Sequence, residues 1–329
     1  MTAMLRRAIL FSILLPPVYL AALFLLSNIS FGNATLMKLA SRNPVDPGED
    51  GFTCQRFAEI EQVKNVDILF LGSSHCYRTF DPRIYAEHGL KTFNMGSSGQ
   101  TPLNTYYLLQ RYFDQLNPKL IVFELYYDLF RRDGLEAYYD LAVNLPFSVE
   151  LLQMALATRN PNGINDAVSR WVMEATGNTP EVVQKPQPGE RYIAGGFVEY
   201  TKLRLKDYQP NPNRTKKTLV MVEEQFEYLD KIAAFAQSKG VKIVFVTQPE
   251  LKATVAAFMN YPEIVARFAE VARKRGVQYF NFNEMPQNFD VPEYYYDREH
   301  LNMQGVALFN QALLQVLTEA GYIPRQYND

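Results

Sequence analysis

The sequence predicts an α/β fold: a three-layer α/β/α sandwich built on a mainly parallel sheet and preceded by one transmembrane helix. Two observations predict the sandwich, namely five short apolar runs without strict polar alternation and amphipathic stretches of helical period between them. The third observation is the charge-free segment from Ala8 to Leu26. At 1.5 Å per residue it is roughly 28 Å long, close to the thickness of a bilayer core.

The N-terminal segment predicts both an anchor and an orientation. Arg6 and Arg7 precede the apolar run, and a positive flank stays in the cytoplasm. Residues 1–30 are therefore interpreted as a cytoplasmic stub and an uncleaved signal anchor of the cell membrane, with the rest of the chain on the periplasmic side. Two alternatives stay open: a cleaved signal peptide that releases a soluble lipase beginning near residue 30, and a buried helix of a soluble protein.

The chain after the anchor divides into a linker at 31–60, rich in Pro, Gly and acidic residues, and a domain at 61–329. The apolar runs of this domain predict parallel strands that are buried on both faces. Amphipathic stretches at 104–116, 221–240 and 263–276 predict helices, and two of them end on glycine. The five predicted strands are VDILFLGSS (66–74), KTFNMGSSG (91–99), KLIVFELYYD (119–128), VKIVFVTQPE (241–250) and VQYFNFNEM (277–285).

Residues 131–216 interrupt the alternation of strand and helix. The segment contains Pro- and Gly-rich stretches, with helical patterns around FSVELLQMALA and AVSRWVMEA. We interpret it as an insertion that caps the site or binds a partner. The alternative is a solvent-exposed elaboration without a role in chemistry.

Composition excludes several classes of function. The net charge is −2, which leaves no basic field for nucleic acid. The three histidines show no ligand spacing, and no Gly-rich phosphate loop is present, so we expect neither a metal nor a cofactor. An extracytoplasmic location would permit Cys54 and Cys76 to pair, but the sequence does not decide whether they do.

Small and polar residues follow three of the predicted strands. Gly72-Ser73-Ser74 ends the first strand, Asn94 to Gly99 ends the second, and Asp297-Arg298-Glu299-His300 follows the fifth. Because ligands bind at the carboxyl ends of strands in such sheets, these blocks point to one site. Asp297 and His300 are three residues apart, so one helical turn would place them on the same face, where the carboxylate can orient the imidazole.

The three blocks, in this order, resemble the SGNH/GDSL hydrolase superfamily over residues 66–317, less the insertion. The resemblance implies that Ser74 is the nucleophile, His300 the general base and Asp297 its orienting acid. It also implies that the backbone N–H groups of Ser74 and Gly96 bind the oxyanion.

Three further residues are candidates for the oxyanion site or for binding. Ser73 is either a helix cap or an alternative nucleophile, His75 is a pocket or turn residue, and Asn94 holds the turn of the second block.

The sequence also departs from the superfamily pattern. Ser73 stands where the motif has an aspartate, and Phe123 to Asp128 lacks the asparagine that would donate to the oxyanion. That donor would have to come from Tyr126, Tyr127 or the insertion. Losing one such donor costs about 100- to 1,000-fold in rate, so chemistry is still expected.

The anchor and the divergent third block resemble the branch that contains the membrane-anchored D-alanyl transfer protein of lipoteichoic acid synthesis, and related proteins of polysaccharide O-acetylation. This resemblance implies an extracytoplasmic esterase or O-acyltransferase that acts on a cell-envelope polysaccharide through an acyl-enzyme. The expected partners are the envelope glycan and a membrane-bound O-acyltransferase. The alternative is a non-catalytic envelope protein that binds either of these. The acyl group, the polymer and the acceptor stay open.

Overall fold

The computed structural model describes residues 2–324 except 28, 32–33, 36–40, 180–181, 186, 203–215 and 287. Its centre is a five-stranded sheet with strand order β4-β3-β5-β8-β9, and all neighbouring pairs are parallel. Each strand lies inside one of the five predicted runs. The strands are β3 (Ile68–Gly72), β4 (Thr92–Gly96), β5 (Leu120–Glu124), β8 (Lys242–Thr247) and β9 (Gln278–Asn281).

Successive residues of the central strands face opposite layers, and both layers are apolar. In β3, Leu69 and Leu71 belong to one buried cluster, whereas Ile68 and Phe70 belong to the other. A strand that is buried on both faces needs apolar residues at every position, which explains the absence of strict alternation.

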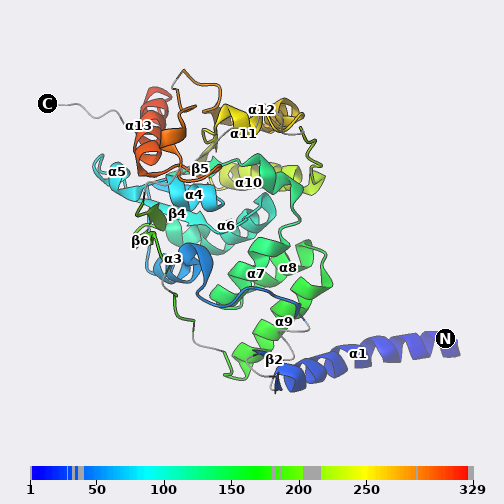
Figure 1. Ribbon diagram of the computed structural model, residues 1–329. Helices are drawn as coiled ribbons and strands as arrows, with labels where there is room; N and C mark the ends of the chain where they lie inside the picture. The colour runs from blue at the N-terminus through cyan, green and yellow to red at the C-terminus, as the bar shows by residue number, and fades with distance from the viewer. Residues whose placement is uncertain are drawn as a thin grey trace.

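Helices cover both faces of the sheet (Figure 1). The predicted helices at 104–116, 221–240 and 263–276 are confirmed with small shifts at their ends. One face carries α6 (Pro102–Leu116), α10 (Glu223–Ser238) and α12 (Tyr261–Arg275); the other carries α4 (Ser74–Thr79), α5 (Pro82–Ala86) and α13 (Met303–Glu319). The predicted three-layer α/β/α fold is thus confirmed.

The segment predicted as a linker ends in ordered structure. Helix α3 (Thr53–Ile60) follows the 3-10 turn η1 (Asp50–Phe52) and buries Phe57 and Ile60 in the core. Phe57 and Ile60 are three residues apart and therefore share one face of the helix. A pattern of only two apolar residues among polar ones is too short to predict a helix from the sequence.

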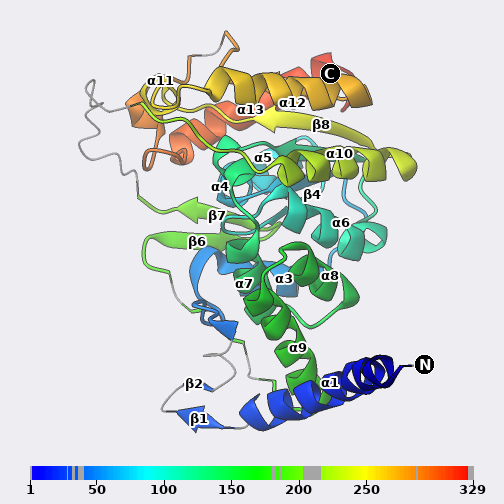
Figure 2. The same cartoon turned by 90° about the vertical axis from the view of Figure 1, so that its right-hand side faces the viewer.

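The predicted insertion folds as helices and a hairpin between the sheet and the N-terminal helix (Figure 2). The two predicted helices are present, and the sequence did not reveal a third helix or the hairpin. The elements are α7 (Leu135–Asn144), α8 (Val149–Ala157), α9 (Pro161–Ala175), β6 (Glu190–Ile193) and β7 (Phe197–Tyr200), with β6 antiparallel to β7.

The N-terminal helix α1 (Ala3–Ser27) is long and apolar enough to cross a membrane. It extends away from the domain, and only its C-terminal part meets the insertion (Figure 1). There Leu23 is buried, and the Tyr19 hydroxyl donates to Asn165 Oδ1 of α9 at 2.5 Å. A two-stranded hairpin, β1 (Ser30–Phe31) and β2 (Ala34–Thr35), follows α1.

The two cysteines do not pair. Both thiols are free: Cys76 is fully buried and donates to Asn94 Oδ1, whereas Cys54 is partly exposed and donates to the Val182 carbonyl. The fold therefore does not depend on a disulfide between these two residues.

Candidate active site

The turn between β3 and α4 requires glycine at two places. Gly72 has a φ of +148°, and a Cβ there would lie 2.5 Å from Glu124 Oε2. At the end of the neighbouring strand, a Cβ on Gly96 would lie 2.6 Å from the Ser73 carbonyl oxygen. Real Cβ atoms do not approach so closely, so these two glycines bring β4 and β5 against the turn that carries the serines.

Ser73 caps α4 with its side chain. Its Oγ accepts from the His75 N–H at 3.2 Å, and its N–H and hydroxyl both donate to Glu124 Oε2 at 3.1 Å. Ser73 is buried, whereas Ser74, the first residue of α4, is partly exposed. The two serines therefore have different surroundings, and the Ser74 hydroxyl faces the site.

Ser74, His300 and Asp297 form a continuous chain of hydrogen bonds. Ser74 Oγ lies 3.0 Å from His300 Nε2, and His300 Nδ1 lies 3.0 Å from Asp297 Oδ2. Burial raises the pKa of Asp297, but hydrogen bonds from His300 and from two backbone N–H groups outweigh it and hold that pKa well below its usual range. Asp297 therefore stays ionised beside the imidazole.

The sequence predicted that Asp297 and His300 share a helical turn, and this prediction is wrong. They occupy a bend before α13, and Asp297 Oδ1 accepts from the N–H groups of Glu299 and His300 at 2.8 Å. An aspartate that binds the N–H two residues onward stabilises such a bend, so the same carboxylate shapes the loop and orients the imidazole.

His75 lies directly behind His300. Its ring stacks on the His300 ring at 4.6 Å and packs against the Tyr126 ring at 4.0 Å. Burial is the main cause, and the nearby His300 the second, of a His75 pKa that lies well below its usual value, so the ring is neutral. Its Nε2 is 2.9 Å from the Glu299 carbonyl oxygen, which requires the proton on Nε2. His75 thus holds the residue that precedes His300.

Replacing His75 with phenylalanine keeps a ring against His300 but removes the hydrogen bond to Glu299. We expect kcat/KM for an aryl acetate to fall about 10- to 100-fold, because a small misplacement of a catalytic group has a cost of this size. Glutamine, whose amide nitrogen can reach the same carbonyl, should recover part of the loss. Equal losses in both variants, without a change in the pH profile, would contradict the positioning role.

Glu124 is a buried carboxyl beneath the serine turn. Burial raises its pKa to about 7, although two hydrogen bonds from Ser73 oppose the shift. A carboxyl whose pKa is higher in the folded state than in the unfolded chain binds protons more tightly when folded. Its contribution to stability is complete below the unfolded pKa near 4.3 and is lost as the pH rises through about 7.

The Glu124→Gln variant should therefore lose part of the pH dependence of unfolding. We expect its free energy of unfolding to fall less than that of the wild type between about pH 4 and pH 7, by up to about 3 kcal/mol. Chemical denaturation at a series of pH values measures this difference. The exposed Glu227→Gln on α10 is the control, and identical curves for all three proteins would refute the expectation.

The insertion contributes one aromatic ring, that of Tyr200, to the rim of the site, and the sequence did not reveal this contact. The Tyr200 ring at the end of β7 stacks on Tyr296 at 3.4 Å and approaches His300 edge-on at 6.4 Å. The Arg78 guanidinium lies 4.4 Å from the centre of the Tyr200 ring on another side. A pair of aromatic rings beside His300 offers an apolar wall to a substrate.

Asn94 lies away from the triad. It is fully buried, and its amide nitrogen donates to the carbonyls of Phe80 at 2.9 Å and Gly195 at 3.1 Å. These bonds attach the insertion to the edge of the sheet. Its role in substrate binding stays a prediction.

The third block offers no asparagine donor at the end of β5. The Tyr127 hydroxyl, which was one candidate, donates instead to Glu250 Oε2 at 3.1 Å, and the Tyr126 ring packs on His75. The Ser74 N–H lies in the first turn of α4, where backbone donors lack intrahelical partners, so it is free to bind an oxyanion. In the part of the chain that the structure describes, no group of three His, Cys, Asp or Glu residues could hold a metal ion.

Several solved structures share part of this architecture. A putative acylhydrolase from Bacteroides fragilis is 13% identical, with a TM-score of 0.43 over 81% of this chain and 96% of that chain. A GDSL-like lipase from Bacteroides thetaiotaomicron is 13% identical, with a TM-score of 0.44 over 83% and 100%. A lipase/acylhydrolase from Enterococcus faecalis is 12% identical, with a TM-score of 0.42 over 79% and 98%.

No protein-family description matches the chain, and no curated protein sequence is similar to it. The chemistry of the site rests on its own side chains, and its central feature is the hydrogen-bonded series Ser74–His300–Asp297.

Proposed function

We propose that the protein is a membrane-anchored serine esterase or O-acyltransferase of the SGNH type. The observation that carries this proposal is the 3.0 Å contact of Ser74 Oγ with an imidazole whose other nitrogen faces an ionised aspartate. A serine hydroxyl attacks an acyl carbon when an imidazole takes its proton and a carboxylate stabilises the imidazolium.

In this proposal the chain acts through an acyl-enzyme. His300 Nε2 removes the proton as Ser74 Oγ bonds to the acyl carbon, and the N–H groups of Ser74 and Gly96 bind the oxyanion. His300 then returns the proton to the leaving alcohol as the ester bond breaks. In the second half, water or a sugar hydroxyl gives its proton to His300 and attacks the acyl carbon; the bond to Ser74 Oγ then breaks as His300 returns the proton to that oxygen.

The test uses the full chain in detergent micelles, a serine-directed fluorophosphonate probe and a short-chain aryl acetate. The proposal expects stoichiometric labelling of Ser74 and turnover of the ester. A folded protein that neither labels nor hydrolyses would favour a non-catalytic envelope protein that binds a glycan or a membrane-bound O-acyltransferase. The observation that favours this second candidate function is the absence, after β5, of the asparagine that would donate to the oxyanion.

We further propose that the domain lies outside the cytoplasm and acts on a cell-envelope glycan. Support comes from the apolar helix α1 and from Arg6 and Arg7 at its N-terminal end. Protease treatment of intact spheroplasts tests the orientation: the domain should be digested without lysis. Protection until the membrane is opened would place the domain in the cytoplasm.

A further inference from the structure

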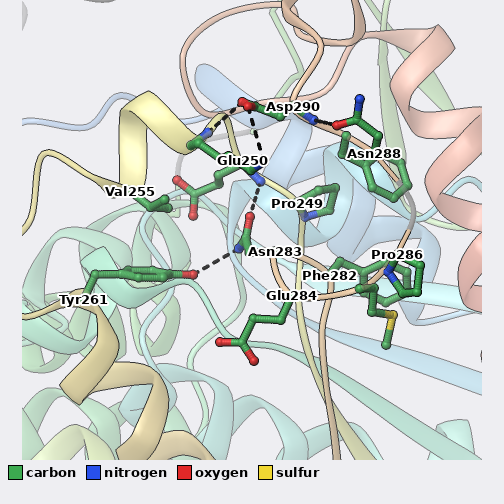
Figure 3. A pocket seen from close by; sticks show the side chains of 13 residues that line it. Pro249, Glu250, Val255, Tyr261, Phe282, Asn283, Glu284, Pro286, Asn288 and Asp290 are labelled. Carbon is green, nitrogen blue, oxygen red and sulfur yellow. Dashed lines mark hydrogen bonds and ion pairs between the residues drawn. The ribbon is translucent and has the colours of Figure 1, made fainter. Parts of the chain in front are cut away.

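A cavity lies at the carboxyl end of the sheet, beside the strands β8 and β9. It has a volume of about 530 Å³ and opens between the segment after β8 and the segment after β9. Figure 3 shows side chains from three elements around it: Glu250 after β8, Tyr261 at the start of α12, and Asn283 after β9. Cavities at the carboxyl ends of parallel strands are the usual ligand sites of such folds.

Glu250 is the residue of this cavity whose carboxyl is available to bind a ligand. Its side chain is 4% exposed, and its Oε2 accepts from the Tyr127 hydroxyl at 3.1 Å. Among the described residues, none forms a hydrogen bond with its Oε1. Burial, together with the neighbouring carboxylates, raises the pKa of Glu250 well above its usual value. Oε1 is not among the buried atoms that lack a partner, so it is accessible from the cavity and can form a hydrogen bond with a ligand hydroxyl.

The rest of the lining has the chemistry of a sugar site. The Asn283 amide nitrogen donates to the Tyr261 hydroxyl at 3.0 Å, which fixes an aromatic ring and an amide at the wall. The Asn283 amide oxygen accepts from the Glu250 backbone N–H at 2.8 Å, so the two loops are held together without a ligand. A preformed wall that combines aromatic rings with several hydrogen-bonding groups suits a ring-shaped, hydroxylated ligand.

The charge of the lining selects among such ligands. Glu284 and Asp290 add two further carboxylates, whereas Lys252 is the single cationic side chain among the described residues of the wall. Lys252 pairs with Asp290, its Nζ lying 3.8 Å from Oδ2, so it is already compensated. The raised pKa of Glu250 favours its neutral form, so the residual negative charge of the wall comes from Glu284. This charge repels phosphates and uronates and favours a neutral or amino sugar.

The cavity adjoins the loop that carries the acid–base pair. The helix α11 (Lys252–Val255) forms part of its wall, and the Thr254 hydroxyl of α11 donates to the Arg298 carbonyl at 3.3 Å. Arg298 lies between Asp297 and His300. This hydrogen bond joins the wall of the cavity directly to the bend that carries Asp297 and His300.

We propose that this cavity is a subsite for a neutral or amino sugar of the glycan whose neighbouring unit is acylated or deacylated at Ser74. The sugar hydroxyls bind Glu250 Oε1 and donate to Asn283 Oδ1, because both N–H groups of the Asn283 amide are already used by Tyr261 and Gln248. The sugar ring packs on Tyr261. The link to acyl transfer rests on the proposed function, whereas the binding of a sugar does not.

The test measures binding to the full chain in detergent micelles by titration calorimetry with cellotetraose, chitotetraose and tetragalacturonate. At least one neutral oligosaccharide should bind, and tetragalacturonate should bind about tenfold more weakly or not at all. Val255→Trp fills the cavity from α11, and Glu250→Leu removes the acceptor oxygens; each should lower the affinity about tenfold or more. The control, Val220→Trp, makes the same change at a valine that is 82% exposed, and should leave the affinity within about twofold.

Three results would overturn the subsite: no binding of either neutral oligosaccharide, equal or tighter binding of tetragalacturonate, or unchanged affinity in both cavity variants. Fluorophosphonate labelling of the same samples separates this outcome from the fate of the proposed function. Labelling without sugar binding removes the subsite and keeps the serine enzyme. If the wild type binds sugar, the cavity variants do not, and no sample is labelled, the subsite is supported and the serine enzyme is rejected.

Discussion

Replacing Ser74 with alanine is expected to lower kcat/KM for an aryl acetate by at least about 10⁴-fold and to abolish fluorophosphonate labelling. The reason is that, among the residues that the structure describes, only this hydroxyl lies at hydrogen-bond distance from His300 Nε2, at 3.0 Å. Losing the nucleophile of a serine triad removes the covalent route, and binding with oxyanion stabilisation leaves only a small residual rate. Steady-state kinetics and mass spectrometry of the labelled protein measure both effects.

Ser73→Ala is the matched control for this prediction. It removes a hydroxyl of the same kind one residue earlier, where the side chain caps α4 and donates to Glu124. We expect it to cost about 0.5–2 kcal/mol of stability, the usual cost of losing a cap, and to keep the labelling. Labelling that survives in Ser74→Ala and disappears in Ser73→Ala would reverse the assignment of the nucleophile.

Replacing Asp297 with asparagine is expected to lower kcat/KM about 10⁴-fold at neutral pH. The amide oxygen can still accept the two backbone N–H groups that shape the bend, so the loop should survive. The amide nitrogen, however, would donate to His300 Nδ1 and force the imidazole proton onto Nε2. His300 could then no longer accept the proton of Ser74.

The control for this variant is Asp114→Asn, which breaks an exposed ion pair with Lys239 near the C-terminal ends of α6 and α10. It should leave kcat/KM within about twofold, as surface substitutions away from a site usually do. The melting temperature of Asp297→Asn should show whether the bend is intact. A folded Asp297→Asn that retains wild-type kcat/KM would mean that His300 is not oriented by this carboxylate.

The sheet was predictable because its strands carry a strong local signal. Runs such as Ile68 to Leu71 are apolar at each position, and this pattern arises only when both faces are covered. The small residues after them, Gly72 and Gly96, marked the edge where the site lies. The residues that directly follow each strand could therefore be predicted to lie near one another at the same edge of the sheet.

The contacts that complete the site were not predictable, because they join residues far apart in the chain. His75 holds Glu299, and Tyr200 of the insertion reaches the rim beside His300. No periodicity links these residues, and one sequence carries no information about which loops fold back. The bend at Asp297 was mistaken for a helical turn for a related reason: a spacing of three suits both structures, and the side-chain hydrogen bonds that choose between them are not visible in the sequence.

The hydrogen bond between Ser74 and His300 closes a loop of 226 residues. Ser74, the proposed nucleophile, is synthesised early, whereas His300, its proposed base, belongs to a bend that follows β9. A nascent chain, or one still crossing a membrane, therefore carries a serine without a proton acceptor and is chemically silent. Activity becomes an all-or-none report of completed folding, and a fluorophosphonate pulse during refolding should time the last long-range closure rather than the formation of the central strands.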